Sequence, residues 1–100
     1  LFGKKDKVDY SNLDILIVED VEINREYEKE MLDNFFGITC DTAENGEVAV
    51  AKAKEHNYDA ILMDMRMPVM DGLEATREIR KFNKSVPIIC MSANVYKEDK

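Results

Sequence analysis

The sequence is poor in the residues that build metal clusters and disulfide frameworks. Its 100 residues include two cysteines and a single histidine, His56. Cys40 and Cys90 each lie in an apolar stretch, so we expect both to be buried, reduced thiols that pack as small hydrophobic groups. Two thiols do not make a disulfide framework, and one histidine with no nearby ligand does not make a zinc site.

Long apolar runs and an excess of positive charge are also missing. No stretch approaches the roughly 20 apolar residues that span a bilayer, and residues 1–13 contain no signal-peptide core. The net charge of −7 argues against a nucleic-acid surface, which would need a basic face. We therefore expect a soluble, cytoplasmic domain that binds neither membrane nor nucleic acid.

Residues 13–100 carry the pattern of one small globular domain. Residues 1–12 are polar and weakly patterned, and we interpret them as a linker or as residues outside the natural domain. Further along, apolar residues recur every four positions at Ile23, Tyr27, Met31 and Phe35, with Leu32 and Phe36 widening the stripe, which predicts an amphipathic helix. Apolar runs and helical segments alternate, which predicts strands over 13–18, 38–43, 59–63 and 86–91 and helices over 23–36, 47–56 and 73–82.

This alternation is typical of an α/β fold, a doubly wound parallel sheet with helices on both faces and right-handed crossovers. Residues 13–18 form an apolar run without alternation, which indicates a strand buried on both faces. Asp41 and Thr42 place the second strand at an edge. We therefore expect the flavodoxin-like strand order 2-1-3-4.

Polar side chains follow three of the predicted strands. Glu19 and Asp20 come after the first, Asp64 after the third and Ser92 after the fourth. In an open α/β sheet the binding site lies beyond the carboxyl ends of the strands, where the strand order reverses. Order 2-1-3-4 would bring the three acids into one pocket with Ser92 beside it.

Three carboxylates in one pocket repel one another, and a hard divalent cation such as Mg²⁺ removes that repulsion. Asp64 beside such an ion is a competent nucleophile toward phosphorus, and Ser92 can donate a hydrogen bond to a phosphoryl oxygen. Taken singly, each acid is explained equally well as a residue that caps a loop. The hypothesis of a metal and phosphorylation site rests on the convergence of the three acids. The methionines around Asp64 are better explained by packing than by a soft-metal site.

The same residues resemble a known family. Ile15–Asp20 with its acidic pair, Asn45-Gly46, the run Ile61–Gly72 and Val86–Ala93 together resemble the receiver (phosphoacceptor) domains of response regulators and hybrid histidine kinases. The resemblance runs from Leu13 to Lys100. It implies a phosphorylation switch in a two-component phosphorelay and a regulatory domain rather than an enzyme. Residues 19–26 resemble receivers attached to hybrid sensor kinases more than those joined to DNA-binding domains, and a stand-alone regulator is the alternative.

The resemblance also implies roles for individual residues. Asp64 would accept a phosphoryl group from a histidine kinase or a histidine phosphotransfer protein. Asp20 and Asp64 would bind Mg²⁺ directly, Glu19 would help through water, and Arg66 would contribute its backbone carbonyl. Ser92 would be the switch hydroxyl.

One departure from the family pattern concerns the end of the sequence. Family members continue with a fourth helix, a fifth strand that ends in a lysine, and a fifth helix, none of which this sequence contains. We therefore expect residues 13–100 to be a receiver that lacks its last strand and helix and so has an open sheet edge. Either the natural polypeptide continues past Lys100, or a second chain covers this edge in a dimer or a swapped assembly. Two alternatives are a non-phosphorylated pseudo-receiver scaffold and an aspartyl phosphohydrolase. A phosphohydrolase of that kind needs a second acid two residues after the nucleophile as its general acid and base, and Arg66 occupies that position.

Overall fold

The computed structural model describes residues 9–65 and 70–91. Over this part of the chain strands and helices alternate, as the apolar pattern predicts. The elements are β1 (Ile15–Val18), α2 (Glu22–Phe36), β2 (Cys40–Ala43), α3 (Gly46–Glu55), β3 (Ala60–Asp64), α4 (Gly72–Arg80) and β4 (Ile88–Met91). None of the helices described is long and apolar enough to cross a membrane.

The strands form one parallel sheet in the order β2-β1-β3-β4. This confirms the flavodoxin-like α/β fold and the edge position of β2. Val18 pairs with Ala43 on one side and with Met63 on the other, so β1, β2 and β3 end almost level. Whatever follows these strands therefore meets at one edge of the sheet.

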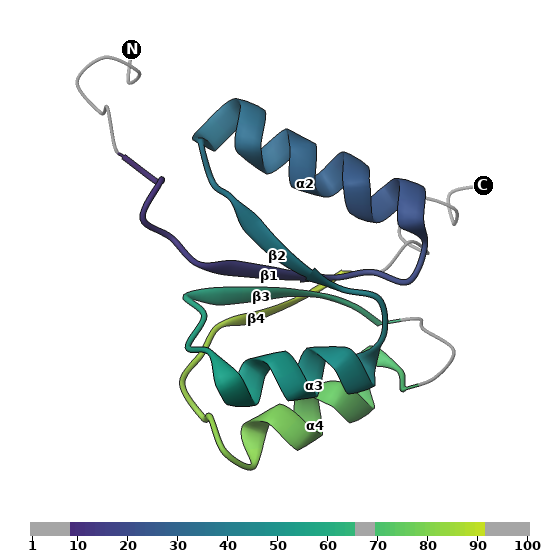
Figure 1. The fold of residues 1–100 in the computed structure, drawn as a ribbon. Helices are drawn as coiled ribbons and strands as arrows, with labels where there is room; N and C mark the ends of the chain where they lie inside the picture. The colour runs from purple at the N-terminus through teal and green to yellow at the C-terminus, as the bar shows by residue number, and fades with distance from the viewer. Residues whose placement is uncertain (1–8, 66–69, 92–100) are drawn as a thin grey trace.

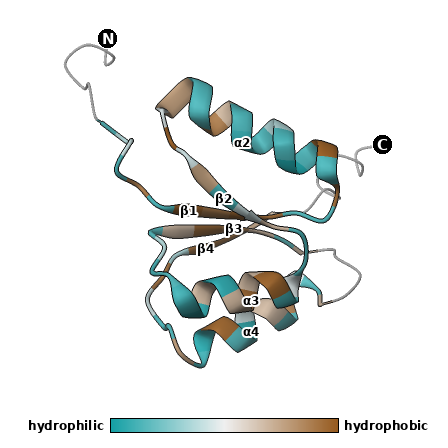
Figure 2. Cartoon of the chain, viewed as in Figure 1, coloured by the Kyte–Doolittle hydropathy of each residue, from teal (hydrophilic) through white to brown (hydrophobic). Residues whose placement is uncertain are grey.

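Helix α2 covers one face of the sheet, and α3 and α4 cover the other (Figure 1). Successive side chains of a strand point to opposite faces, and β1, which is buried throughout, supplies both sides of the core. Leu16 and Val18 belong to the larger cluster, with α3 and α4, while Ile15 and Ile17 belong to the smaller one. In Figure 2 hydrophobic colour is concentrated on the strands, whereas α2 is largely hydrophilic.

The predicted apolar stripe of α2 is helical, but most of it does not face the sheet. Ile23, Tyr27 and Phe35 are 73%, 64% and 75% exposed, and no residue of α2 is buried. The partly buried positions are instead those of Arg25, Glu28, Met31 and Leu32. Gly37 ends the helix in the left-handed region (φ 71°), as a glycine just beyond a helix commonly does.

The two cysteines differ. Cys40 is buried, as expected, and burial raises the pKa of its thiol to about 11. The prediction for Cys90 is wrong, because this residue is exposed. Its strand, β4, is the outer strand of the described sheet, and Ile89 beside it is also 52% exposed. Burial on an edge strand needs a covering element as well as an apolar sequence.

Candidate functional site

Three carboxylates meet beyond the carboxyl ends of β1 and β3. Glu19 and Asp20 directly follow β1, and Asp64 is the last residue of β3. One oxygen from each of the three carboxylates lies within 4.8 Å of the others. Because β1 and β3 are neighbours at the switch point of the sheet, the strand order itself produces this convergence. The other two predicted site residues, Arg66 and Ser92, lie outside the described part of the chain.

Glu19 is the most buried of the three acids, with 7% of its surface exposed. Its Oε2 accepts a hydrogen bond from the Val21 amide at 3.2 Å, and its backbone carbonyl accepts one from Arg25 Nη1 at 2.9 Å. Burial raises the pKa of Glu19, and the charges of Asp64 and Asp20 raise it further, against the opposing effect of the Val21 amide. A cation at this point would relieve both the desolvation and the repulsion.

The cluster suits a hard divalent cation. Its donor atoms are all carboxylate oxygens, from one buried and two partly exposed side chains, and Mg²⁺ prefers oxygen ligands with part of its shell left to water or phosphate. Within residues 9–65 and 70–91, this is the only group of three or more histidine, cysteine or acidic side chains placed closely enough to hold a metal ion.

A fourth carboxyl, that of Glu28, faces this acidic cluster from α2. Burial, followed by the charges of Glu19 and Asp64, raises its pKa to about 7. Its Oε1 is buried and has no hydrogen-bond partner among the residues described. Sequence reasoning missed Glu28 because an acid in an amphipathic helix is usually solvated. The available signal was its spacing, three residues after Arg25 and four before Leu32, on the face that packs on the sheet.

The backbone of Asp64 is held by its neighbours. The amide of the next residue, Met65, donates to the Met91 carbonyl at 3.0 Å and thereby extends the pairing of β3 with β4. Gly72, the first residue of α4, packs so closely that a Cβ there would lie 2.5 Å from the Asp64 carbonyl oxygen. The end of β3 is therefore fixed by strand pairing on one side and by a helix start on another.

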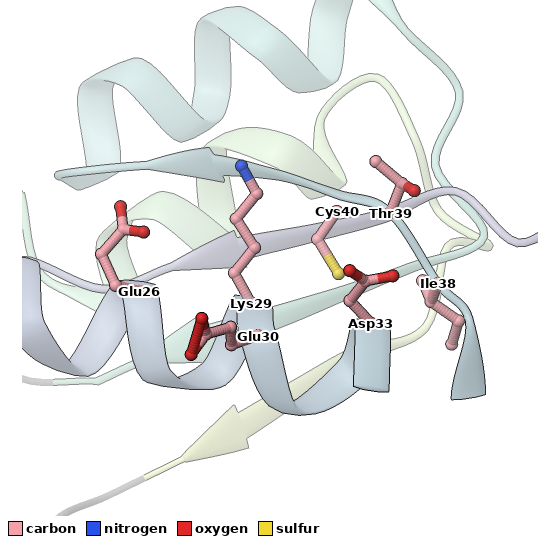
Figure 3. A pocket seen from close by; sticks show the side chains of 7 residues that line it. All are labelled: Glu26, Lys29, Glu30, Asp33, Ile38, Thr39 and Cys40. Carbon is pink, nitrogen blue, oxygen red and sulfur yellow. The ribbon is translucent and has the colours of Figure 1, made fainter. Parts of the chain in front are cut away.

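Two other cavities lie away from the acids. A groove of about 180 Å³ runs between α2 and the start of β2, with Cys40 and Lys29 among its lining side chains (Figure 3). A polar cavity of about 270 Å³ lies near the amino ends of the strands. Beside it His56, for which the sequence offered no partner, has its Nε2 3.3 Å from Asp14 Oδ2. Neither cavity contains a metal-binding group of the kind that Glu19, Asp20 and Asp64 form.

Comparison with known protein families identifies the family to which this fold belongs. The sequence profile of the response regulator receiver domain matches residues 15–100. The chain belongs to this receiver family. The match begins at the first residue of β1 and covers every element of the described sheet.

Individual relatives agree with the family assignment. The two-component response regulator ORR41 of rice is 47% identical over 83 residues, which are 80% of this chain and 65% of that protein. The receiver domain of the sensor histidine kinase PA1611 of Pseudomonas aeruginosa has 43% identity and a TM-score of 0.79, over 87% of this chain and 72% of that one. That receiver was solved with a magnesium ion coordinated in its active-site cleft.

A further structural relative was solved together with a partner. The response regulator TrrA of Thermotoga maritima, in complex with the histidine kinase ThkA, has 41% identity and a TM-score of 0.77 over 88% of this receiver and 75% of that chain. This receiver thus spans about two thirds to three quarters of the length of these relatives.

Proposed function

We propose that this receiver is a phosphorylation switch in which Asp64 accepts a phosphoryl group with the help of Mg²⁺. The observation that carries the proposal is the convergence of Glu19, Asp20 and Asp64 to within 4.8 Å at the switch point of the sheet. The magnesium ion in the cleft of the PA1611 receiver supports the choice of metal.

In the proposed reaction, a carboxylate oxygen of Asp64 attacks the phosphorus of a phosphohistidine. An oxygen–phosphorus bond forms as the phosphorus–nitrogen bond breaks, and the imidazole nitrogen keeps the electron pair and takes a proton from solvent. Bound Mg²⁺ supplies positive charge that offsets the charge on the transferring group. We assign direct metal ligation to Asp20 and Asp64.

The remaining site residues have supporting roles in this proposal. Glu19 acts on the ion through water, and Arg66 contributes its backbone carbonyl. The Ser92 hydroxyl donates a hydrogen bond to the phosphorylated Asp64 and so stabilises the active conformation. These assignments follow from the family resemblance and from the places of the three residues in the sequence, shortly after β1, β3 and β4.

The phosphoryl donor is a histidine kinase or a histidine phosphotransfer protein, in the cytoplasm. The complex of TrrA with the kinase ThkA supports this class of partner. A pseudo-receiver scaffold is the second candidate, and the intact set of three converging acids speaks against it. In this reading the domain is a regulated acceptor rather than an enzyme.

The test is phosphorylation by a small donor. We expect wild-type protein incubated with acetyl phosphate and Mg²⁺ to gain the mass of one phosphoryl group in intact mass spectrometry. Asp64→Asn should gain none, because an amide is not a nucleophile toward phosphorus. Asp33→Asn, which changes an exposed aspartate on α2, is the matched control and should be labelled like wild type. Stable labelling of Asp64→Asn would overturn the assignment.

A further inference from the structure

Helix α3 starts in direct contact with the segment that leads into α4. Gly46, its first residue, is buried. A Cβ at Gly46 would overlap the Met70 carbonyl oxygen and would lie 2.7 Å from Met70 Cβ and 2.8 Å from Met70 Cγ. Real Cβ atoms essentially never approach other heavy atoms so closely. A side chain at position 46 would therefore displace either the start of α3 or Met70.

The backbone conformation at position 46 does not explain why glycine occurs there. Among the residues described, Gly37 alone has a positive φ, so Gly46 adopts a conformation open to any residue. Inside a helix, alanine is favoured over glycine by up to about 1 kcal/mol. The contact with Met70 is what excludes a side chain at Gly46.

A second contact of the same kind continues from Met70 toward the acids. Gly72 lies two residues further on, and a Cβ there would lie 2.5 Å from the Asp64 carbonyl oxygen and 2.7 Å from Met65 Cα. Asp71, between the two contacts, caps α4 through its Oδ1, which accepts a hydrogen bond from the Glu74 amide at 2.9 Å. The start of α4 is thus packed between the start of α3 and the backbone of Asp64.

We propose that Gly46 is a positioning residue for Asp64. It lets Met70 approach α3, which seats Gly72 against the Asp64 carbonyl and holds the carboxylate within reach of Glu19 and Asp20. The inference rests on the proposed function, because the role of Asp64 is defined there. It adds a residue that lies on another element and contributes no ligand to the cluster.

A side chain at Gly46 moves the start of α4 and, through Gly72, the end of β3. Misplacing a reacting group by about 1 Å can cost up to about 100-fold in rate. We therefore expect Gly46→Ala to weaken Mg²⁺ binding and to slow phosphorylation by acetyl phosphate, each by about tenfold, although every carboxylate remains.

The matched control is Asn45→Ala. Asn45 caps α3 through its Oδ1, which accepts a hydrogen bond from the Val48 amide at 2.9 Å. Losing such a cap destabilises a helix by about 1 kcal/mol but leaves the contact between Gly46 and Met70 unchanged. Asn45→Ala should thus lower stability while keeping Mg²⁺ affinity and phosphorylation rate within about twofold of wild type. If Gly46→Ala acted only by destabilising α3, it would give the same result as Asn45→Ala.

The experiment measures three quantities on the full chain: the Mg²⁺ dissociation constant by calorimetry, the rate of labelling by acetyl phosphate, and the free energy of unfolding in urea. Wild-type Mg²⁺ affinity and rate in Gly46→Ala would overturn the inference. Losses that match those of Asn45→Ala at equal stability would overturn it too. If wild type binds Mg²⁺ but takes no phosphoryl group, the proposed function fails, while the Mg²⁺ comparison still decides the role of Gly46.

A second pair of variants covers the case in which Gly46→Ala does not fold. Met70→Gly removes two of the three atoms that a Cβ at Gly46 would meet, and the carbonyl oxygen remains. Gly46→Ala/Met70→Gly should therefore fold more readily than Gly46→Ala and still bind Mg²⁺ more weakly than Met70→Gly alone. Equal Mg²⁺ affinity in Met70→Gly and in the double variant would contradict the proposal.

Discussion

Glu28 should make the stability of this receiver depend on pH in an unusual direction. Its carboxyl has an ordinary pKa of 4.5 and a folded pKa of about 7. Between these values the folded state holds a proton that the unfolded state has released. The contribution of Glu28 to the free energy of unfolding is therefore fully present below about pH 4.5 and falls as the pH rises toward 7. Above about pH 7 this contribution is lost.

The magnitude follows from the size of the shift and the exposure of the side chain. A fully buried group with this shift would cost about 3 kcal/mol above pH 7, at about 1.4 kcal/mol for each unit. Glu28 is only half-buried, and solvent screening reduces the cost to about 1 kcal/mol. Glu28→Gln keeps the shape of the side chain and removes the charge that Glu19 and Asp64 repel.

The assay is urea unfolding, followed by circular dichroism, at several values between pH 4.5 and 8. We expect Glu28→Gln to be about 1 kcal/mol more stable than wild type at pH 8, equivalent to roughly 4–8 °C in Tm, and the advantage to vanish near pH 4.5. Glu30→Gln removes the same charge from an exposed position of the same helix and should show no such trend. A stability difference between Glu28→Gln and wild type that does not change with pH would refute the reasoning.

Three further predictions concern the metal, the switch and the sheet edge. Asp20→Asn should weaken Mg²⁺ binding at least about tenfold and Glu19→Gln by less, since only the first removes a direct ligand; equal affinity of Asp20→Asn and wild type in a calorimetric titration would contradict this. Ser92→Ala should still be phosphorylated but should show smaller chemical-shift changes at the surface, and full wild-type shifts would show that Ser92 is not the switch. Ile89, half exposed on the outer strand of the described sheet, should make the 100-residue polypeptide associate. Ile89→Lys should then lower the mass seen by light scattering, and a wild type that stays monomeric at every concentration would argue against this.

The order of the elements could be predicted because each strand is a short apolar run closed by polar residues. The residues at which the strands begin could not be predicted in the same way. Leu13 and Val86 were placed in strands, yet β1 begins at Ile15 and β4 at Ile88. Val86 is buried without being in β4, because apolar residues mark burial, whereas a strand is defined by its hydrogen bonds.

The helical period of α2 was predictable, but its buried face was not. Ile23, Tyr27 and Leu32 were assigned to one apolar stripe, yet of these three only Leu32 packs on the sheet, on the same face as Glu28. A period identifies the helix and its apolar stripe, but which neighbour covers that stripe depends on the rest of the fold. The same limit explains Cys90, whose apolar strand lacks a cover in the part of the receiver described here.

The acidic cluster was predictable from topology alone. Glu19, Asp20 and Asp64 had to converge once β1 and β3 were neighbours, since parallel strands end at one edge of the sheet. The contacts of Gly46 could not be predicted, because they depend on how the helices settle on the sheet.

The unequal division of the core has a consequence for local unfolding. Ala49, Ala53, Ala75 and Ile79 tie α3 and α4 to the sheet as buried residues, while α2 contributes none. Regions with few buried apolar contacts open with the smallest free energy, often while the rest of a domain stays folded. Amide hydrogens of α2 should therefore exchange with solvent through openings that leave β1, β3, α3 and α4 intact. Because Arg25 of α2 donates a hydrogen bond to the backbone carbonyl of Glu19, each such opening also removes one of the contacts that hold the acidic residues after β1.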